Sequence, residues 1–264
     1  MSSVFRRTAR LAAVALIAAG LAACGAKQQV PQLGEAQADK FLFDRGTEAL
    51  AKKSWLSARE YFRRLVDSYP QSQYRAEAKL GIGDSYLGEG RVDNLILGAN
   101  EFKEFLAYFP TSPRSDYAQY RLTWAASEQM LSAQRDQTAT HEALGEAVKF
   151  IESYPESKYR PEVEKLYREA RDRLSESYFR IGLLYYRSRW MPGAASRFSD
   201  IVREDPGYTK RDELFYYYGE TLIRLNGQAE ALAMFEKILA EFPKSKFRKK
   251  AEKRVAELKT TLKR

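Results

Sequence analysis

Four residues at fixed spacing recur along this chain of 264 residues and restrict how it can fold. Gly46, Ala58, Phe62 and Pro70 are separated by steps of 12, 4 and 8 residues. The same residues at the same steps recur as Gly182, Ala194, Phe198 and Pro206, and as Gly219, Ala231, Phe235 and Pro243. Three copies of one register predict a fold built from a repeated unit.

Each position in this register has a physical role in a helical hairpin. A glycine on the first helix lets the second helix approach closely. Ala58 and Phe62, one turn apart, place a small and a large side chain on one face of the second helix. Pro70 cannot continue that helix and ends it. A single copy is also compatible with a generic helical hairpin, but the repeated register is the tetratricopeptide pattern, with about 34 residues per unit.

We therefore predict an all-α fold: a tetratricopeptide-like right-handed superhelix of about five helical hairpins plus a C-terminal capping helix. The N-terminal repeats 1–3 occupy 39–155, and a long helix, repeats 4–5 and the capping helix occupy 156–264. Within these units we expect three extra residues in the turn around 89–95, a longer connection at 130–140, a long helix at 162–188 and a last helix at 245–262.

A short motif closes four of the repeats: an aromatic residue, a proline, any residue and a serine. The serines are Ser72, Ser112, Ser157 and Ser245. Because a serine hydroxyl can accept a hydrogen bond from a free amide at a helix start, each is predicted to be the N-cap of the next helix.

The N-terminus reads as a targeting segment. Residues 1–23 combine a start rich in arginine with an apolar run, which predicts a signal peptide that is removed. The run ends in Leu21-Ala22-Ala23-Cys24, similar to the bacterial lipobox, in which the cysteine becomes the acylated N-terminus, for example with palmitate. An ordinary secretory peptide is the alternative. Residues 24–38 are polar and predict a flexible tether with the lipidated Cys24 at its start.

Composition excludes several classes of function. The net charge of +9 resides in residues 1–23 and 244–264, so the repeats are near neutral and a nucleic-acid partner is not expected. One cysteine and one histidine allow neither an internal disulfide nor a Cys/His metal cluster. His141 is expected at the surface in a loop-like stretch. Without a phosphate loop or nucleophile motif, we predict no enzyme, no cofactor and no metal.

Four further segments carry a resemblance to a known family. They are Asp116-Tyr117-x-x-Tyr120, Arg135-Asp136-Gln137, Tyr154-Pro155-x-Ser157-x-Tyr159 and Arg171-Asp172-Arg173-Leu174. With the lipobox and the repeats, they make residues 20–262 similar to the BamD family, the lipoproteins of the outer-membrane β-barrel assembly machinery. Thr123 departs from the family pattern, which has glycine there.

The resemblance implies a lipid-anchored protein of the cell outer membrane that faces the periplasm. It would bind a BamA-like barrel protein through the periplasmic domains of that partner, join other Bam lipoproteins and receive unfolded outer-membrane proteins. The alternative is another envelope tetratricopeptide lipoprotein that coordinates cell-wall synthesis or acts as a secretion pilot. The cell-division type usually has a coiled coil before its repeats, and residues 25–40 are too short for one.

The repeat register also yields candidate binding residues. Those expected to line a peptide groove on the first helices are Phe43, Asp44, Thr47, Glu77, Leu80, Asp84, Tyr120, Arg121 and Trp124. Each aromatic among them could instead belong to the core between repeats. The candidates for a partner surface on repeats 4 and 5 are Arg187, Arg189, Tyr216 and Tyr217.

Overall fold

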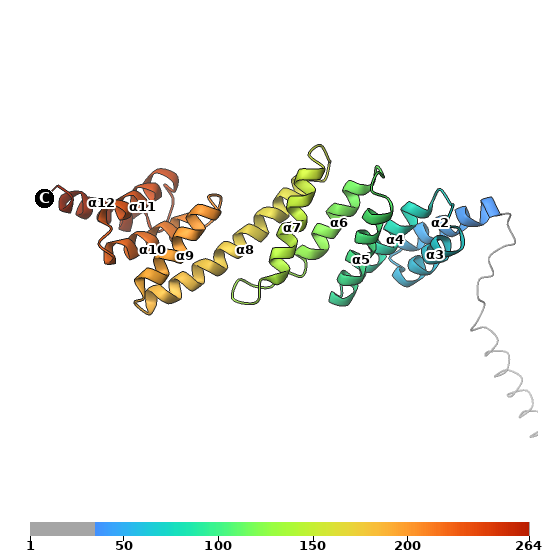
Figure 1. Cartoon of the computed structure of the whole chain (residues 1–264), viewed down its shortest axis with the longest axis horizontal. Helices are drawn as coiled ribbons and strands as arrows, with labels where there is room; N and C mark the ends of the chain where they lie inside the picture. Colours follow the sequence, from blue (N-terminus) through green and yellow to red (C-terminus); the bar gives the residue numbers. More distant parts are fainter. Residues whose placement is uncertain (1–34, 264) are drawn as a thin grey trace, which may run out of the picture.

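The computed structural model describes residues 35–263, and every regular element in that range is an α-helix. Figure 1 shows these helices stacked in series from α2 at one end to α12 at the other, so the described chain is an extended solenoid. The helices are α2 (Glu35–Ala51), α3 (Trp55–Ser68), α4 (Arg75–Glu89), α5 (Val92–Tyr108), α6 (Ser115–Ser127), α7 (Thr138–Ser153), α8 (Arg160–Arg187), α9 (Met191–Glu204), α10 (Arg211–Arg224), α11 (Gln228–Glu241) and α12 (Arg248–Thr261).

The predicted packing of glycine against phenylalanine closes each hairpin. A Cβ atom placed on the register glycine would lie under 3.0 Å from the phenylalanine ring of the paired helix, closer than real side chains approach. The pairs are Gly46 with Phe62 (2.5 Å), Gly83 with Phe102 (2.7 Å), Gly182 with Phe198 (2.5 Å) and Gly219 with Phe235 (2.6 Å). Only glycine therefore allows these two helices to approach as closely as they do.

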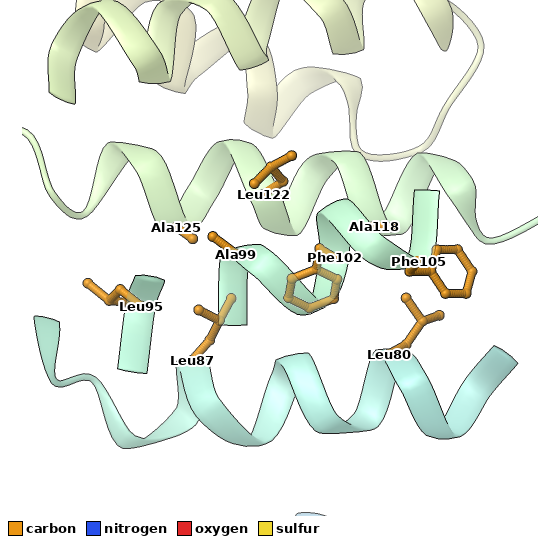
Figure 2. Packing of buried hydrophobic residues seen from close by; sticks show 9 residues of the cluster. All are labelled: Leu80, Leu87, Leu95, Ala99, Phe102, Phe105, Ala118, Leu122 and Ala125. Atoms are coloured by element: carbon orange, nitrogen blue, oxygen red, sulfur yellow. The ribbon is translucent and has the colours of Figure 1, made fainter. Parts of the chain in front are cut away.

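A second layer of apolar contacts joins one hairpin to the next, shown for α4, α5 and α6 in Figure 2. Leu87 of α4 and Leu122 of α6 lie on opposite sides of α5, whose Phe102 and Phe105 are fully buried between them. Because α5 packs both on its own partner and on the following hairpin, the core runs continuously along the stack.

A hydrogen bond between successive first helices recurs at the aromatic-Pro-x-Ser turns. The serine hydroxyl donates to an aspartate in the first turns of the preceding first helix. The pairs are Ser72 with Asp39 (2.6 Å), Ser157 with Asp116 (2.7 Å) and Ser245 with Asp212 (2.5 Å). These bonds hold the starts of neighbouring first helices together.

The prediction that these serines are N-caps is wrong in position. Each serine lies two residues before the N-cap, and its Oγ accepts a hydrogen bond from the amide of the N-cap residue itself. At Ser72 this amide is that of Tyr74, at 3.1 Å. The serine therefore orders the turn before the helix rather than the helix start.

Three boundaries also differ from the sequence prediction. The turn after α4 is short, with Gly90 at φ 68°, and the extra residues of repeat 2 lengthen the start of α5 by about one turn. The connection between α6 and α7 covers 128–137, so His141 lies in the first turn of α7 rather than in a loop. Residues 35–38 belong to α2 rather than to the expected tether.

Helix α8, with 28 residues, confirms the predicted long helix and carries two hairpins (Figure 1). Val163 in its first part packs into the core with α7, whereas Phe179 in its second part packs against α9. The carboxylate of Asp205, at the C-terminal end of α9, accepts hydrogen bonds from Arg168 at 2.9 and 2.5 Å and from Ser175 at 2.5 Å. This contact fixes the C-terminal half of the solenoid on the middle of α8.

The capping helix is present as α12, and Phe247, Ala251 and Leu258 bury its apolar side against α11. The predicted signal peptide at 1–23 and the lipidation site Cys24 lie outside the described residues. No helix within 35–263 combines the length and the apolar character needed to cross a bilayer.

The close contact between a register glycine and a phenylalanine ring predicts opposite changes in stability when two different glycines are replaced by alanine. Gly219→Ala should lower the midpoint of urea unfolding, because overpacking a buried ring costs about 1–3 kcal/mol and exceeds the gain in helix propensity. Gly145→Ala, in α7, should raise the midpoint, because the free energy of unfolding should increase by about 0.5–1 kcal/mol where a Cβ would meet nothing within 4 Å. Circular dichroism of the two variants measures both effects. Equal shifts in the same direction would contradict the packing role.

Asp205 makes a prediction about pH. Burial by itself raises the pKa of this carboxyl, but the hydrogen bonds from Arg168 and Ser175 and the nearby positive charge outweigh burial and hold the pKa below its usual value. A carboxylate with a depressed folded-state pKa stabilises above its unfolded pKa of about 3.9, and this contribution disappears as the pH falls through the folded pKa. Asp205→Asn should therefore cost about 2 kcal/mol near pH 7, and the difference from the parent chain should shrink below about pH 4.

The matched control is Asp200→Asn, also on α9, whose ion pair with Arg203 is exposed. It should cost less than about 1 kcal/mol. Thermal unfolding followed from pH 3 to pH 7 gives both curves. If the cost of Asp205→Asn stayed constant across this range, the pairing of the Asp205 carboxylate with the Arg168 guanidinium would not be the source of the stabilisation.

Candidate functional site

An ion pair between two first helices forms the centre of the surface that α4 and α6 share. The Nε atom of Arg121 on α6 lies 2.9 Å from a carboxylate oxygen of Asp84 on α4. The hydroxyl of Tyr117, one turn before Arg121, donates to both oxygens of the same carboxylate at 2.8 Å. About four-fifths of the Asp84 and Arg121 side chains is buried, so this is a fixed feature rather than a solvated pair.

Burial is the main influence on the pKa values of Asp84 and Tyr117. Desolvation raises the pKa of the Asp84 carboxyl above its usual value, although the Arg121 charge and the Tyr117 hydroxyl oppose the shift. Desolvation also raises the pKa of Tyr117, and the neighbouring Asp84 raises it further. The phenol therefore stays neutral and remains a hydrogen-bond donor at every physiological pH.

Aromatic rings and cations surround this pair. The guanidinium of Arg121 lies over the ring of Trp124 at 5.1 Å, and that of Arg114 lies over Tyr117 at 4.5 Å. Arg114 also approaches Glu77 of α4 at 3.6 Å. We call Glu77, Asp84, Arg114, Tyr117, Tyr120, Arg121 and Trp124 the α4–α6 surface.

Two of the segments that carry the family resemblance meet beside this surface. The ring of Tyr120 stacks on that of Tyr159, with centroids 4.8 Å apart and planes 4° from parallel. Ser157 donates to Asp116, and Tyr159 also contacts Tyr117 at 5.5 Å. The two motifs therefore form one contact between α6 and the start of α8, and they position the rings of the surface.

The other two segments hold the connection between α6 and α7. Arg173 of α8 donates to the backbone carbonyls of Met130 and Leu131 at 2.9 and 3.1 Å. Asp136 accepts a hydrogen bond from the amide of Thr138 at 2.9 Å, and this bond lowers the pKa of its carboxyl. The roles visible for these motif residues are structural.

The structure brings together only some of the predicted groove residues. Glu77, Asp84, Tyr120, Arg121 and Trp124 lie on the α4–α6 surface. Asp44 and Thr47 are exposed on α2, where Asp44 forms an ion pair with Lys40 at 2.6 Å. Both residues lie on α2, outside the α4–α6 surface, so they remain separate candidates.

Two of the predicted groove residues belong to the core. Leu80 is 2% exposed and packs with Phe102 and Phe105, which corrects its assignment to the groove. Phe43 is half-buried and stacks on Tyr74 at 4.9 Å, so its main contact is the junction of the first two repeats. A helix in this stack is covered on more than one side, so the sequence period does not separate these buried positions from exposed ones.

The C-terminal candidates divide in the same way. Arg187 and Arg189 are exposed at the turn between α8 and α9, where Arg189 has φ 63°. Tyr216 and Tyr217 are half-buried; Tyr216 stacks on Phe247 at 4.8 Å, which places it between α10 and α12. The two arginines therefore remain the accessible members of the predicted partner surface.

Sequence reasoning missed several residues that complete these surfaces. Tyr117 and Arg114 were not among the groove candidates, although Tyr117 lies one turn before Arg121 and the spacing i, i+4 could have indicated it. Arg254 of α12 forms two hydrogen bonds with the carboxylate of Glu220, at 2.6 and 2.8 Å. That pair spans two repeats, and no local spacing signals it.

The α4–α6 surface offers contacts to a peptide rather than groups for a reaction. Aromatic faces, a neutral phenol and partly paired cations can bind side chains and backbone groups of an extended chain. Within residues 35–263, no three His, Cys, Asp or Glu side chains cluster in a way that could hold a metal ion.

The stacked hairpins define the class of the protein: it is a tetratricopeptide-repeat solenoid. Residues 213–245 match the tetratricopeptide-repeat profile, and the fold is similar to the TPR2AB domain in the yeast Sti1–pHSP90 complex. The TM-score is 0.50 at 11% identity, over 86% of this chain and 85% of that domain, and this likeness concerns the fold alone.

Residues 35–221, well over half of the chain, match the profile of the YfiO family, described as outer membrane lipoprotein. The chain therefore belongs to the YfiO family of outer-membrane lipoproteins.

Curated relatives agree with this family. A protein of Caulobacter vibrioides named outer membrane protein assembly factor BamD is 25% identical over 85% of this chain and 73% of its own length. A protein of Xylella fastidiosa with the same name is 21% identical over 72% of this chain and 68% of its own. The predicted resemblance to the BamD family is thereby confirmed, and the protein is associated with the outer membrane.

The buried ion pair predicts a pH-dependent cost of losing its cation. Arg121→Gln leaves Asp84 without a countercharge, which should cost about 1–3 kcal/mol at pH 7 and less at pH 5, where Asp84 can become protonated. Because the pKa of this carboxyl is raised in the folded state, the folded protein loses stability as the pH rises through that pKa. The cost of the substitution is therefore larger at pH 7 than at pH 5. Urea unfolding at the two pH values measures it.

Arg114→Gln at the N-cap of α6 is the control, because its contact with Glu77 is longer and more exposed, and because its charge affects Asp84 less than that of Arg121 does. It should cost less than about 1 kcal/mol at both pH values. An Arg121→Gln cost that is equal at pH 5 and pH 7 would argue against a charge effect.

Proposed function

We propose that this chain is a non-enzymatic assembly factor for β-barrel proteins of the outer membrane. The match of residues 35–221 to the outer-membrane lipoprotein family carries the proposal, and the names of the relatives in two bacteria support it. A solenoid of stacked hairpins suits this task, because it offers long surfaces to several polypeptides without needing a catalytic centre.

Attachment to the membrane rests on the N-terminal segment. Removal of residues 1–23 would leave Cys24 as the acylated first residue, followed by Gly25 and a short tether to α2. More than one acyl chain gives stable anchoring, at about 0.8 kcal/mol per buried CH₂ group. The protein would then lie on the periplasmic face of the outer membrane.

The α4–α6 surface is the proposed receiving site for unfolded barrel proteins. A strand of such a protein alternates apolar and polar side chains. The rings of Trp124 and Tyr120 suit the apolar side chains, whereas Asp84, Arg114 and Arg121 suit the polar ones. Tyr117 holds Asp84 in place and so keeps the charged centre fixed.

Repeats 4 and 5 are the proposed scaffold for the rest of the complex. The partners are a BamA-like barrel protein, bound through its periplasmic domains, and other Bam lipoproteins. Arg187 and Arg189 are exposed at one turn and can form new ion pairs. Tyr216 and Tyr217 support this region from within, since they pack between α10 and its neighbours.

Affinity capture from detergent-extracted membranes tests the scaffold role. The tagged chain should recover a barrel protein with periplasmic domains, and Arg187→Glu with Arg189→Glu should reduce this recovery at least about tenfold by reversing two charges. The control is Arg64→Glu on the exposed side of α3, which should leave recovery unchanged. Depletion of the chain should also lower the amount of folded barrel proteins in the outer membrane.

Other outcomes favour the alternative functions. Recovery of only cell-wall synthases, with normal barrel proteins after depletion, would contradict the proposal and support a role in wall synthesis. Cys24→Ala tests the anchor separately, since it should release the chain from the membrane fraction. Release without a loss of barrel assembly would mean that the lipid is not needed for the function.

A further inference from the structure

Most of the large apolar side chains that remain exposed lie along one edge of the solenoid. The first helices start at the other edge, where hydrogen bonds between serine and aspartate join them, so the hairpin turns share this edge. Figure 1 shows the α6–α7 connection and the α8–α9 turn on the lower side of the stack. Eight of the eleven exposed large apolar residues in the described chain lie within two helical turns of a hairpin turn, which indicates a surface that is covered in the cell: Leu56, Val92, Ile96, Leu97, Leu131, Leu184, Trp190 and Leu225.

The first two hairpins form one continuous part of this edge. Trp55, the first residue of α3, packs against Gly88 near the end of α4, where an added Cβ would lie 2.6 Å from its ring. Leu56 therefore lies beside the turn of the second hairpin, and Val92 and Ile96 follow that turn in α5. Their exposed fractions are 64%, 64% and 48%. We call Leu56, Val92, Ile96 and Leu97 the tip patch.

Hydrogen bonds behind the tip patch join the two hairpins. The guanidinium of Arg59 on α3 donates to the carboxylate of Glu89 at 2.6 Å and to the backbone carbonyl of Ser85 at 3.2 Å. The same carboxylate accepts a hydrogen bond from Asn94 on α5. Only 9% of Arg59 is exposed. Because α3 and α5 are held through one carboxylate, the tip patch is a fixed surface made by two hairpins.

Three cations lie at the turns beside the tip patch. Lys52 and Lys53 belong to the first turn and Arg91 to the second, and all three are exposed. Lys52 pairs with Glu48, whereas Arg91 reaches Asp93 only at 4.0 Å. In the part of the chain that the structure describes, Lys53 has no carboxylate oxygen within 4.0 Å. Exposed apolar side chains next to lysine and arginine are typical of protein surfaces that bind the interface of a bilayer.

We propose that the tip patch rests on the phospholipid headgroups of the membrane that carries the chain. Leu56, Val92 and Ile96 then enter the interface, where their apolar surface leaves water, which is favourable. Lys53 and Arg91 lie at the depth of the lipid phosphates, which attract them. Because the patch is small, the contact orients the chain on the membrane and does not replace the lipid anchor.

The length of the segment before α2 fits this orientation, which rests on the lipid anchor proposed above. Ten residues separate Cys24 from Glu35, and a chain of this length spans at most about 36 Å. Helix α2 has 17 residues and is about 25 Å long, so its start lies within reach of a bilayer that touches its end. The segment also keeps the tip patch at a high effective concentration near the membrane, so a weak contact is sufficient.

The size of the tip patch favours a lipid surface over a second protein. A stable protein interface takes about 20–30 residues from each side, whereas the patch offers four apolar residues at the ends of two hairpins. A bilayer needs no matching shape, because mobile lipids close around whatever side chains enter the interface. A lipid surface therefore uses both the apolar tip and the cations at the turns.

Quenching by nitroxide-labelled lipids tests the contact on the whole lipidated chain. Cys24 is its only cysteine, and a thiol that carries lipid does not react, so Ser57→Cys beside Leu56 carries a single fluorescent label. The matched control is Ser68→Cys at the other end of α3, exposed and about 16 Å farther from the edge. In vesicles of phosphatidylethanolamine and phosphatidylglycerol, the label at position 57 should be quenched at least about threefold more strongly, because side chains enter the interface by only about 5–10 Å. Equal quenching of the two labels would overturn the proposal.

Substitutions inside the tip patch show which side chains make the contact. Leu56→Ser combined with Val92→Ser should lower the quenching at position 57 at least about threefold, since two apolar side chains no longer enter the interface. The control, Leu131→Ser with Leu225→Ser, changes two exposed leucines at the turns of the third and fifth hairpins and should leave the quenching unchanged. Circular dichroism confirms that each variant is folded. An equal effect of both pairs would also contradict the proposal.

Two further outcomes separate this contact from the anchor and from a protein partner. Labelling of the parent chain would show a free Cys24 and reject the anchor. The two labels are then compared in chains that carry Cys24→Ala with excess vesicles, where equal quenching would overturn the contact as well. A label at position 57 that is shielded in native membranes but not quenched in protein-free vesicles would mean that a protein covers the tip patch, and the proposal would be wrong.

Discussion

The close contact between a register glycine and a phenylalanine ring is the constraint on which the rest of the structure depends. It sets the distance between the two helices of a hairpin and leaves no room for a Cβ atom at Gly46, Gly182 or Gly219. Because each hairpin has the same internal geometry, the next one can stack on it in nearly the same way. The continuous core, the exposed first helices and the capping role of α12 all follow from that repetition.

The motifs that link this chain to its family act mainly on this stack. Ser157 joins Asp116, and Tyr159 stacks on Tyr120, so one motif holds another in place between two repeats. Arg173 fixes the connection between α6 and α7 through backbone carbonyls. A family signature of this kind preserves the arrangement of surfaces, which is what a protein that binds other polypeptides requires.

Helix α8 gives the solenoid two parts with different surfaces. The α4–α6 surface, with its buried ion pair, belongs to the first part, whereas the exposed Arg187 and Arg189 belong to the second. The same long helix separates α7 from α9 and opens a cleft that a regular repeat would close. Asp205, bound by Arg168, holds the end of α9 on the middle of α8.

The sequence by itself determined the helical class, the hairpin register and the length of α8, because these depend on local periodicity, on proline and on glycine. It also predicts a lipobox that ends at Cys24. Only the tertiary structure decided which polar side chains meet: Asp84 with Tyr117, or Arg254 with Glu220, are about one repeat apart in sequence. It likewise placed Leu80 in the core, although its helical period fits an exposed face equally well. The physical reason is that a helix in a stack has neighbours on more than one side, and the pattern of one helix does not identify the side that its neighbour covers.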